Sequence, residues 1–371
     1  MHGLSTSHIR SVRELRSQAD AWDDLWSRSE VTAPTARAAL IAHWVDHFAP
    51  GSRLLALTVR QGDRLVAALP LVTRRKRHLL KCMDIPGNEW TSAGQLLLDP
   101  DCHVPRACGL LAAKMAELPC AAYWFASVPV DAPSWRSLVD ALGRVGLKAT
   151  VQPRYQVGRL VVASASDRQP AHASRQFRRR MDRAVRDLER TGTLRLRRES
   201  PRESEHAREL LTQGLRLEHA GWKGRQKTSV LTYPDTTEFY LQQAEQLARW
   251  SQLELLVLEH SGRAIAFEYG WRAKQVYHSF KVAYDEQYRR HSPGQLLLWM
   301  LLQESDQNML PRAIDFLGPL DDAVRRWHPD GYRVGRILVP HRGLVAKTIA
   351  WASGMWLPDP VPLSPTVDVE R

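Results

Sequence analysis

The residues best suited to bind an anionic group lie in "YDEQYRRHSPGQLLLWMLL", residues 284–302. A strand-like apolar run precedes a basic loop at 289–291, and Ser292, Pro293 and Gly294 are typical of a helix start. The free N–H groups of a helix N-terminus attract phosphate, and neighbouring cations add to that attraction. The same three residues also start helices that bind nothing, so both interpretations stay open.

A second basic segment covers residues 171–198, where ten arginines stand against three acids. Its apolar residues recur every three or four positions and predict one buried stripe on an amphipathic helix. The stripe consists of Phe177, Met181, Ala184, Val185 and Leu188. The arginines then form a solvated face, contact a phosphate, or bind RNA. The lack of interleaved aromatic residues disfavours an RNA-binding arm.

Two similar hairpins indicate which kind of scaffold positions these two basic segments. "LLALTVRQGDRLVAALPL" at 54–71 and "LELLVLEHSGRAIAFEYG" at 253–270 each join two apolar strands through a turn that contains glycine. Helices are expected before each hairpin, and a strand and a helix after it. The pattern predicts an internal duplication of an α/β unit with a mixed sheet.

The domain organisation follows from this duplication. A polar stretch at 163–172 separates an N-terminal unit, residues 1–165, from a C-terminal unit, residues 166–356. The proline-rich tail at 357–371 is expected to be disordered.

Composition limits the possible functions. The net charge of +12 and a pI near 9.8 favour anionic partners such as nucleic acid, acidic lipid or phosphate-bearing molecules. The four cysteines form no CxxC pair, so we expect no metal site. The N-terminus has no apolar signal region, and no uncharged stretch reaches the roughly twenty residues of a membrane helix. We therefore expect a cytoplasmic protein. Motifs of P-loop, dinucleotide-binding, serine-hydrolase and zinc-protease enzymes are absent from the sequence.

The order of several short motifs over residues 174–327 resembles a known family. They are "FRRRMDRAVRDLERTG", "LRLEHAGWKGR", "SGRAIAFEYG", "AYDEQYRRHSPGQLLLWMLL", "AIDFLG" and "RRW". This order resembles the BioF2-like, CelD/BcsL-type acetyltransferases of the GNAT superfamily, bacterial proteins linked to cellulose and other exopolysaccharide production. They are similar in plan to Fem-type aminoacyltransferases. The resemblance implies a tandem GNAT fold of two similar units, and it is looser over residues 22–100.

The resemblance also implies a donor, an acceptor and their contacts. The donor is acetyl-CoA or another acyl-CoA, with its pyrophosphate at residues 290–295. The acceptor is an amine or hydroxyl on an exopolysaccharide, cellulose or cell-envelope precursor. The implied donor contacts are Arg289, Arg290, Ser292, Pro293, Gly294 and Gln295. The candidate substrate-binding residues are Trp222, Lys223, Tyr284, Asp315 and Trp327.

Acyl transfer from a thioester needs a base for the acceptor and an acid for the leaving thiolate. Glu218 and Asp285 are the candidate bases, and Tyr332 or His278 can protonate the thiolate. Each also has a structural interpretation: Glu218 as a surface residue and Asp285 as a turn former. Likewise, Asp315 can cap a turn, and Trp222 and Trp327 can be packing residues.

One departure from the family keeps other functions open. The family commonly has a Tyr-Lys pair before its Arg-Arg-Trp, but Ala323 and Val324 stand there in this chain, and "FLPG" is changed to "FLGP". Two alternatives therefore remain: a Fem-like transferase that uses aminoacyl-tRNA, and a non-catalytic protein that binds RNA or a partner on a GNAT scaffold.

Overall fold

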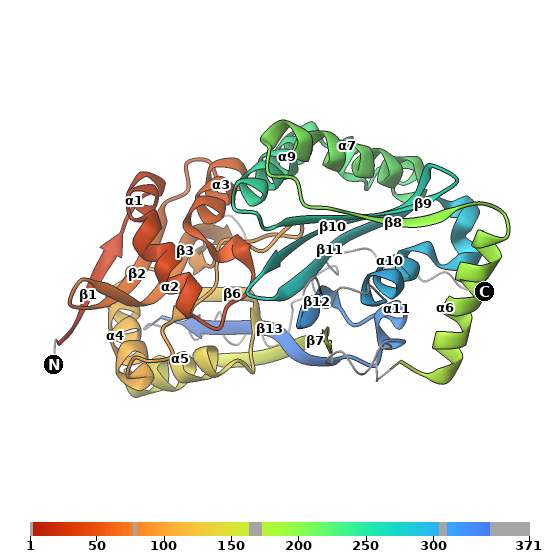
Figure 1. The fold of residues 1–371 in the computed structure, drawn as a ribbon. Coiled ribbons are helices and arrows are strands. Elements are labelled where there is room, and N and C mark those ends of the chain that lie inside the picture. Colours follow the sequence, from red (N-terminus) through yellow and green to blue (C-terminus); the bar gives the residue numbers. More distant parts are fainter. Residues whose placement is uncertain (1–2, 77–79, 163–172, 304–309, 342–371) are drawn as a thin grey trace. The chain divides into compact units, whose positions relative to one another are not determined.

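The computed structural model describes residues 3–76, 80–162, 173–303 and 310–341 (Figure 1). The chain divides into two compact units, Met1–Gln156 with Tyr332–Arg371, and Val157–Gly331. The boundary expected at residue 165 and the tail at 357–371 fall outside the described residues. Unlike the predicted division, this one assigns the residues from Tyr332 onward to the first unit.

The first unit holds a mixed sheet in the order β1-β2-β3-β4-β6-β13. Its strands are β1 (Leu4–Ile9), β2 (Leu54–Gln61), β3 (Arg64–Lys76), β4 (Leu80–Asp84), β6 (Ala122–Pro129) and β13 (Asp330–Pro340), with the short β5 (Leu97–Leu98) paired to β3. Its helices are α1 (Val12–Ser17), α2 (Ala19–Arg28), α3 (Ala38–Phe48), α4 (Val104–Glu117) and α5 (Pro133–Arg144). Strands β4 and β6 are parallel, and the other neighbours are antiparallel.

The second unit repeats that plan in the order β8-β9-β10-β11-β12-β7. Its strands are β7 (Thr150–Val161), β8 (Leu194–Glu199), β9 (Leu253–His260), β10 (Arg263–Ala273), β11 (Val276–Tyr284) and β12 (Ala313–Pro319). Its helices are α6 (Arg175–Glu189), α7 (Ser204–Ala220), α8 (Trp222–Arg225), α9 (Pro234–Arg249), α10 (Pro293–Leu302) and α11 (Asp322–Arg325). Again one pair, β11 with β12, is parallel and the others are antiparallel.

The two predicted hairpins are confirmed. Strands β2 and β3 are joined by Gly62 and Asp63, and β9 and β10 by Ser261 and Gly262. Both glycines have positive φ, 60° and 78°, which the tight turns of hairpins require. The shared order, strand directions and hairpins support the predicted α/β fold of two similar units.

Helices cover both faces of the second sheet (Figure 1). On one face α7 packs so closely that a Cβ on its Gly214 would lie 2.1 Å from the ring of Phe267 in β10. On the other face the side chains of α6 and α10 share a core with β9, β10 and β11. The predicted apolar stripe of α6 is confirmed, since Phe177, Met181 and Leu188 are buried there. Because that stripe is docked, the arginines of α6 occupy its remaining faces.

Candidate functional site

The start of α10 is the best anion-binding feature of the second unit. Ser292 occupies the position before the helix, but its backbone is left-handed, with φ 52° and ψ 55°, and no side chain caps the helix. Ser292 thus stands at the expected N-cap position of α10, but its hydroxyl makes no capping bond. Pro293 has no N–H, and the N–H groups of Gln295 and Leu296 donate to the carbonyl of Ser292. The N–H of Gly294 is thus the free donor that an anion at this terminus would meet.

Arginines surround this helix start. Arg289 and Arg290 belong to the 3-10 turn Glu286–His291 that leads into α10, and both are exposed. From α6, the guanidinium of Arg180 donates to Ser292 Oγ at 2.7 Å. This bond brings the arginine helix to the same place as the basic loop, a contact that residue spacing could not predict.

His291 adds no positive charge to this cluster. Its side chain is buried, and Arg290 Nε donates to its Nε2 at 2.8 Å. Burial, with Arg290 beside it, lowers the pKa of His291. The ring therefore orients Arg290 as a neutral hydrogen-bond acceptor.

Gln295 and Trp327 contact each other. The indole N–H of Trp327 donates to Gln295 Oε1 at 2.6 Å, and Trp327 is fully buried between Phe177 and Trp299. Gln295 thereby ties the first turn of α10 to the core. Trp327 is a packing residue, one of the two interpretations that the sequence left open.

Strands β11 and β12 separate beside α10. Their parallel pairing covers only three residue pairs and ends at His278 and Asp315. Just beyond, β11 shifts register against β10 between Ser279 and Lys281, which places a bulge at Phe280. Within the described residues, no strand pairs with this edge of β11 past His278, so the edge is open to an added strand there.

Glu218 lies at the end of α7 on the face of the sheet opposite to α10. Its side chain is buried; Oε1 accepts from Lys223 Nζ at 2.8 Å and Oε2 from the N–H of Val230 at 3.0 Å. Burial disfavours the ionised form, but Lys223, Lys281 and these two bonds outweigh it and hold the pKa of Glu218 below its ordinary value. An ionised carboxylate with both oxygens engaged is a weak base.

Asp285 follows β11 and is also engaged. Its Oδ1 accepts from the N–H of Gln287 at 3.0 Å, and its Oδ2 from Arg263 at 2.6 Å. Asp285 therefore caps the turn before α10, as a turn-forming aspartate does. Tyr284 packs against the same core that holds α10.

Lys281 is the group that the sequence interpretation missed. It is half-buried at the bulge of β11, with its ammonium 5.0 Å from the ring centre of Tyr240 and 5.2 Å from that of Phe280. Burial lowers the pKa of Lys281 to about 8, although Glu218 opposes the shift. A lysine inside the apolar strand pattern "VYHSFKVAY" is the signal that could have identified it.

Glu268 is a second missed group, on β10 opposite Val282. It is fully buried, and burial raises its pKa to about 7 despite the neighbouring hydroxyls of Ser279 and Tyr277. A buried acid in "AIAFEYG" breaks the apolar pattern in the same way as Lys281 does.

The remaining candidate site residues are not part of this cluster. His278 is buried and its pKa is lowered by burial to about 3, so it is neutral and cannot act as an imidazolium acid. Asp315 is 5% exposed, and its Oδ1 accepts from the N–H of Leu317 at 2.9 Å. Tyr332 belongs to the first unit and is not part of the site described here. Trp222 lies beside Lys223, whose ammonium is 5.9 Å from its ring centre.

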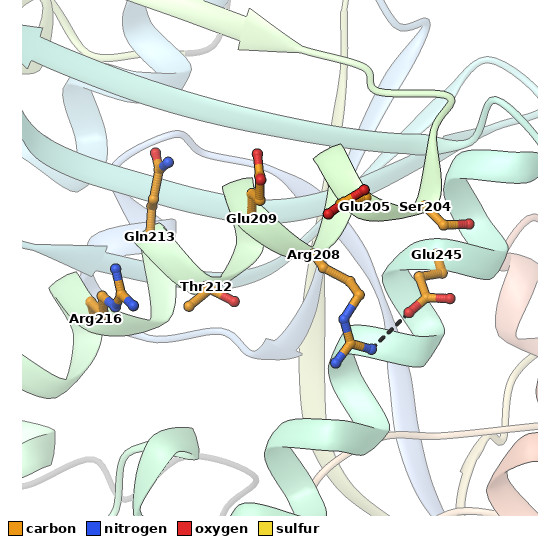
Figure 2. A pocket seen from close by; sticks show the side chains of 8 residues that line it. All are labelled: Ser204, Glu205, Arg208, Glu209, Thr212, Gln213, Arg216 and Glu245. Carbon is orange, nitrogen blue, oxygen red and sulfur yellow. Dashed lines mark hydrogen bonds and ion pairs between the residues drawn. The ribbon is translucent and has the colours of Figure 1, made fainter.

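A hollow of about 810 Å³ on α7 and α9 does not overlap with this cluster (Figure 2). In Figure 2, Arg208 reaches from α7 toward Glu245 on α9, 2.7 Å away, and it also contacts Glu238. Of the two arginines that line the hollow, Arg208 and Arg216, the first is thus already paired with two carboxylates.

Within the described ranges, no helix is long and apolar enough to cross a bilayer. The same residues contain no group of histidine, cysteine and acidic side chains that could hold a metal ion.

Solved structures share this fold. FemX is similar with a TM-score of 0.63 at 11% identity, over 94% of this chain and 99% of that one. A conserved protein of unknown function from Bacteroides thetaiotaomicron has a TM-score of 0.51 at 10% identity, over 92% and 100% of the two chains. The C-terminal domain of a putative lysylphosphatidylglycerol synthetase from Agrobacterium fabrum gives 0.52 at 11%, over 95% and 99%. At such identities the likeness shows the fold alone.

A family model identifies the second unit more closely. No curated protein matches the chain. The model of the acetyltransferase (GNAT) domain matches residues 175–325, from the arginine helix to α11. This part of the chain, with the uncapped start of α10 and the divergent strands β11 and β12, is similar to a GNAT acetyltransferase domain.

Proposed function

We propose that the protein transfers an acyl group from acyl-CoA to an amine or hydroxyl acceptor. The observation that carries this proposal is the juxtaposition of an uncapped helix start, three arginines and an open strand edge. The pyrophosphate of the donor binds the N–H of Gly294 and the guanidinium groups of Arg289 and Arg290. Arg180 moves from Ser292 to the phosphate.

The pantetheine arm of the donor fits the open edge of β11. Its amides pair with the backbone of β11 past His278 as an added strand would. This places the thioester near the bulge at Phe280, where backbone N–H groups stabilise the oxyanion. The acceptor nitrogen or oxygen forms a bond to the carbonyl carbon, the C–S bond breaks, and the thiolate leaves.

In this proposal Lys281, rather than Glu218 or Asp285, is the base that removes the proton from the acceptor. The carboxylates of both acids already accept two hydrogen bonds each. Lys281 stands at the bulge, and a lysine in apolar surroundings loses its proton near neutral pH. In its neutral form it accepts the proton, which passes to the leaving thiolate or to water.

The acceptor is proposed from the resemblance alone. The resemblance of the motifs over residues 174–327 supports an exopolysaccharide, cellulose or cell-envelope precursor, handled in the cytoplasm, as this acceptor.

A Fem-like transferase that uses aminoacyl-tRNA is the second candidate. The observation that favours it is the arginine-rich outer surface of α6, where Arg175 and Arg179 are exposed. Such a surface suits a polyanion longer than a diphosphate.

Thermal unfolding of the full chain tests these two candidates. Acetyl-CoA should raise the melting temperature in proportion to the logarithm of its concentration. Stabilisation by tRNA alone, with an effect that falls steeply as salt is added, supports the second candidate. No stabilisation by either ligand contradicts both.

A further inference from the structure

The divergence of β11 and β12 is abrupt. β11 continues to Tyr284 and β12 to Pro319, yet the pairing of the two strands stops at His278 and Asp315. Parallel neighbours normally continue to pair while both are extended, because each buried backbone group needs a partner. Something local must therefore turn β12 away.

A kink in β12 follows Asp315 directly. Leu317 has a left-handed backbone, with φ 55°, which is unfavourable for a residue other than glycine. The carboxylate of Asp315 accepts the N–H of Leu317 at 2.9 Å, the bond of an aspartate that stabilises a turn two residues on.

The kink also lengthens β12 relative to its other neighbour. Asp315 pairs with Arg159 of β7, but the next pair joins Pro319 to Val157, so β12 has two more residues than β7 over this interval. The intervening Gly158 leaves the space that the chain after the kink fills. A Cβ at Gly158 would lie 2.8 Å from Val324 Cγ1 and 2.9 Å from Pro329 Cγ.

We propose that Asp315 is a positioning residue for the acyl donor. It holds the kink at Leu317, and this kink keeps β12 from pairing with β11 past His278. This inference rests on the proposed function, because it assigns the open edge of β11 to the donor. Asp315 does not touch the donor; it acts through the backbone of β12. Without its carboxylate, Leu317 returns to extended backbone, β12 pairs further along β11, and the gap closes.

Asp315→Ala and Asp315→Asn separate this role from a purely structural one. Asparagine keeps the side-chain oxygen that accepts the N–H of Leu317, and alanine does not. Asp321→Ala is the matched control, since Asp321 Oδ1 accepts the N–H of Val324 at 2.8 Å just beyond β12 and has no part in the kink.

Two measurements on the full chain test the proposal. The first is the Kd for acetyl-CoA by calorimetry: Asp315→Ala should weaken binding at least tenfold, while Asp315→Asn and Asp321→Ala stay within about twofold of the unsubstituted protein. The second is amide hydrogen exchange of residues 279–284 without ligand: exchange should be slower in Asp315→Ala alone, because the closed gap protects these amides.

Leu317→Gly provides a variant that does not depend on Asp315→Ala folding. Glycine adopts the left-handed backbone without strain, so this variant should bind acetyl-CoA as tightly as the unsubstituted protein and exchange residues 279–284 as fast. Loss of binding in Leu317→Gly, or unchanged exchange and affinity in Asp315→Ala, overturns the role of the kink. Absence of acetyl-CoA binding by the unsubstituted protein overturns the proposed donor instead, while the exchange comparison still decides whether Asp315 holds the strands apart.

Discussion

The two units share a sheet plan but differ at the start of the helix that precedes the last parallel strand. In the first unit, the ring of His103 caps α4 by accepting the N–H of Arg106 at 3.2 Å, and Asp99 and Asp101 stand just before it. In the second unit, no side chain caps α10, and Arg289 and Arg290 precede it. One helix start is closed and acidic, and the other is open and basic.

The parallel strands differ in a corresponding way. In the first unit, the buried carboxylate of Asp84 reaches from β4 to accept the N–H of Ala126 in β6 at 3.3 Å. In the second unit, the carboxylate of Asp315 in β12 accepts the N–H of Leu317 in its own strand. The comparison teaches that a few side chains at the ends of similar elements distinguish the unit with the proposed donor site from the other unit.

Removal of the basic loop should have the largest effect. The variant Arg289→Ala/Arg290→Ala should raise the Kd for acetyl-CoA by at least about 100-fold, since each charged hydrogen bond contributes about 1.5–3 kcal/mol. Arg106→Ala, at the start of α4 in the first unit, is the matched control and should leave the Kd unchanged in calorimetry. Equal losses in both variants would show that the difference between the helix starts has no functional meaning.

The second-largest effect should come from the buried ion pair of Glu218 with Lys223 in the second unit. Glu218→Ala leaves Lys223 without its partner and should lower the free energy of unfolding by about 3–5 kcal/mol. The exposed pair of Asp131 with Arg333 in the first unit should contribute much less, because both charges stay solvated. Urea titrations of Glu218→Ala and Asp131→Ala measure the two effects. A Glu218→Ala variant as stable as Asp131→Ala contradicts the structural role of Glu218.

Lys281 should make stability depend on pH in the alkaline range. Its folded pKa, about 8, lies below the ordinary value of 10.5, so the folded chain releases this proton first and stability rises as pH increases between those values. Lys281→Met lacks this contribution. At pH 7 the Lys281→Met variant should therefore be more stable than the unsubstituted protein, by at most about 3 kcal/mol. This difference in the free energy of unfolding should shrink by pH 10.5, as chemical unfolding at both pH values can measure. A difference that stays constant over this range contradicts the buried position of Lys281.

Substitutions in the hairpin turns should have the smallest effect on stability, and the two units should respond to them most alike. Gly62→Ala and Gly262→Ala each place a Cβ on a left-handed backbone and should cost about 1 kcal/mol. Similar shifts in melting temperature would support a common hairpin geometry. A cost confined to one turn would count against the duplication.

Local features were predictable from the sequence. The hairpins followed from glycine turns between apolar strands, the stripe of α6 from its period, and the start of α10 from Pro293, because each signal lies within a few residues. The contacts of the proposed site were not predictable from the sequence. Arg180 meets Ser292 across more than a hundred residues, and Glu218, Lys223 and Lys281 meet only through the packing of α7 on β11. The left-handed backbone of Ser292 and Leu317 also has no signal in residue type, since neither is glycine.

Calorimetric titration of acetyl-CoA into the full chain tests the central claim most directly. One donor molecule should bind per chain, because among residues 3–76, 80–162, 173–303 and 310–341 only the second unit has an open, basic helix start beside an unpaired strand edge. Binding of two molecules per chain, or of one molecule that the Arg289→Ala/Arg290→Ala variant retains, would contradict this account.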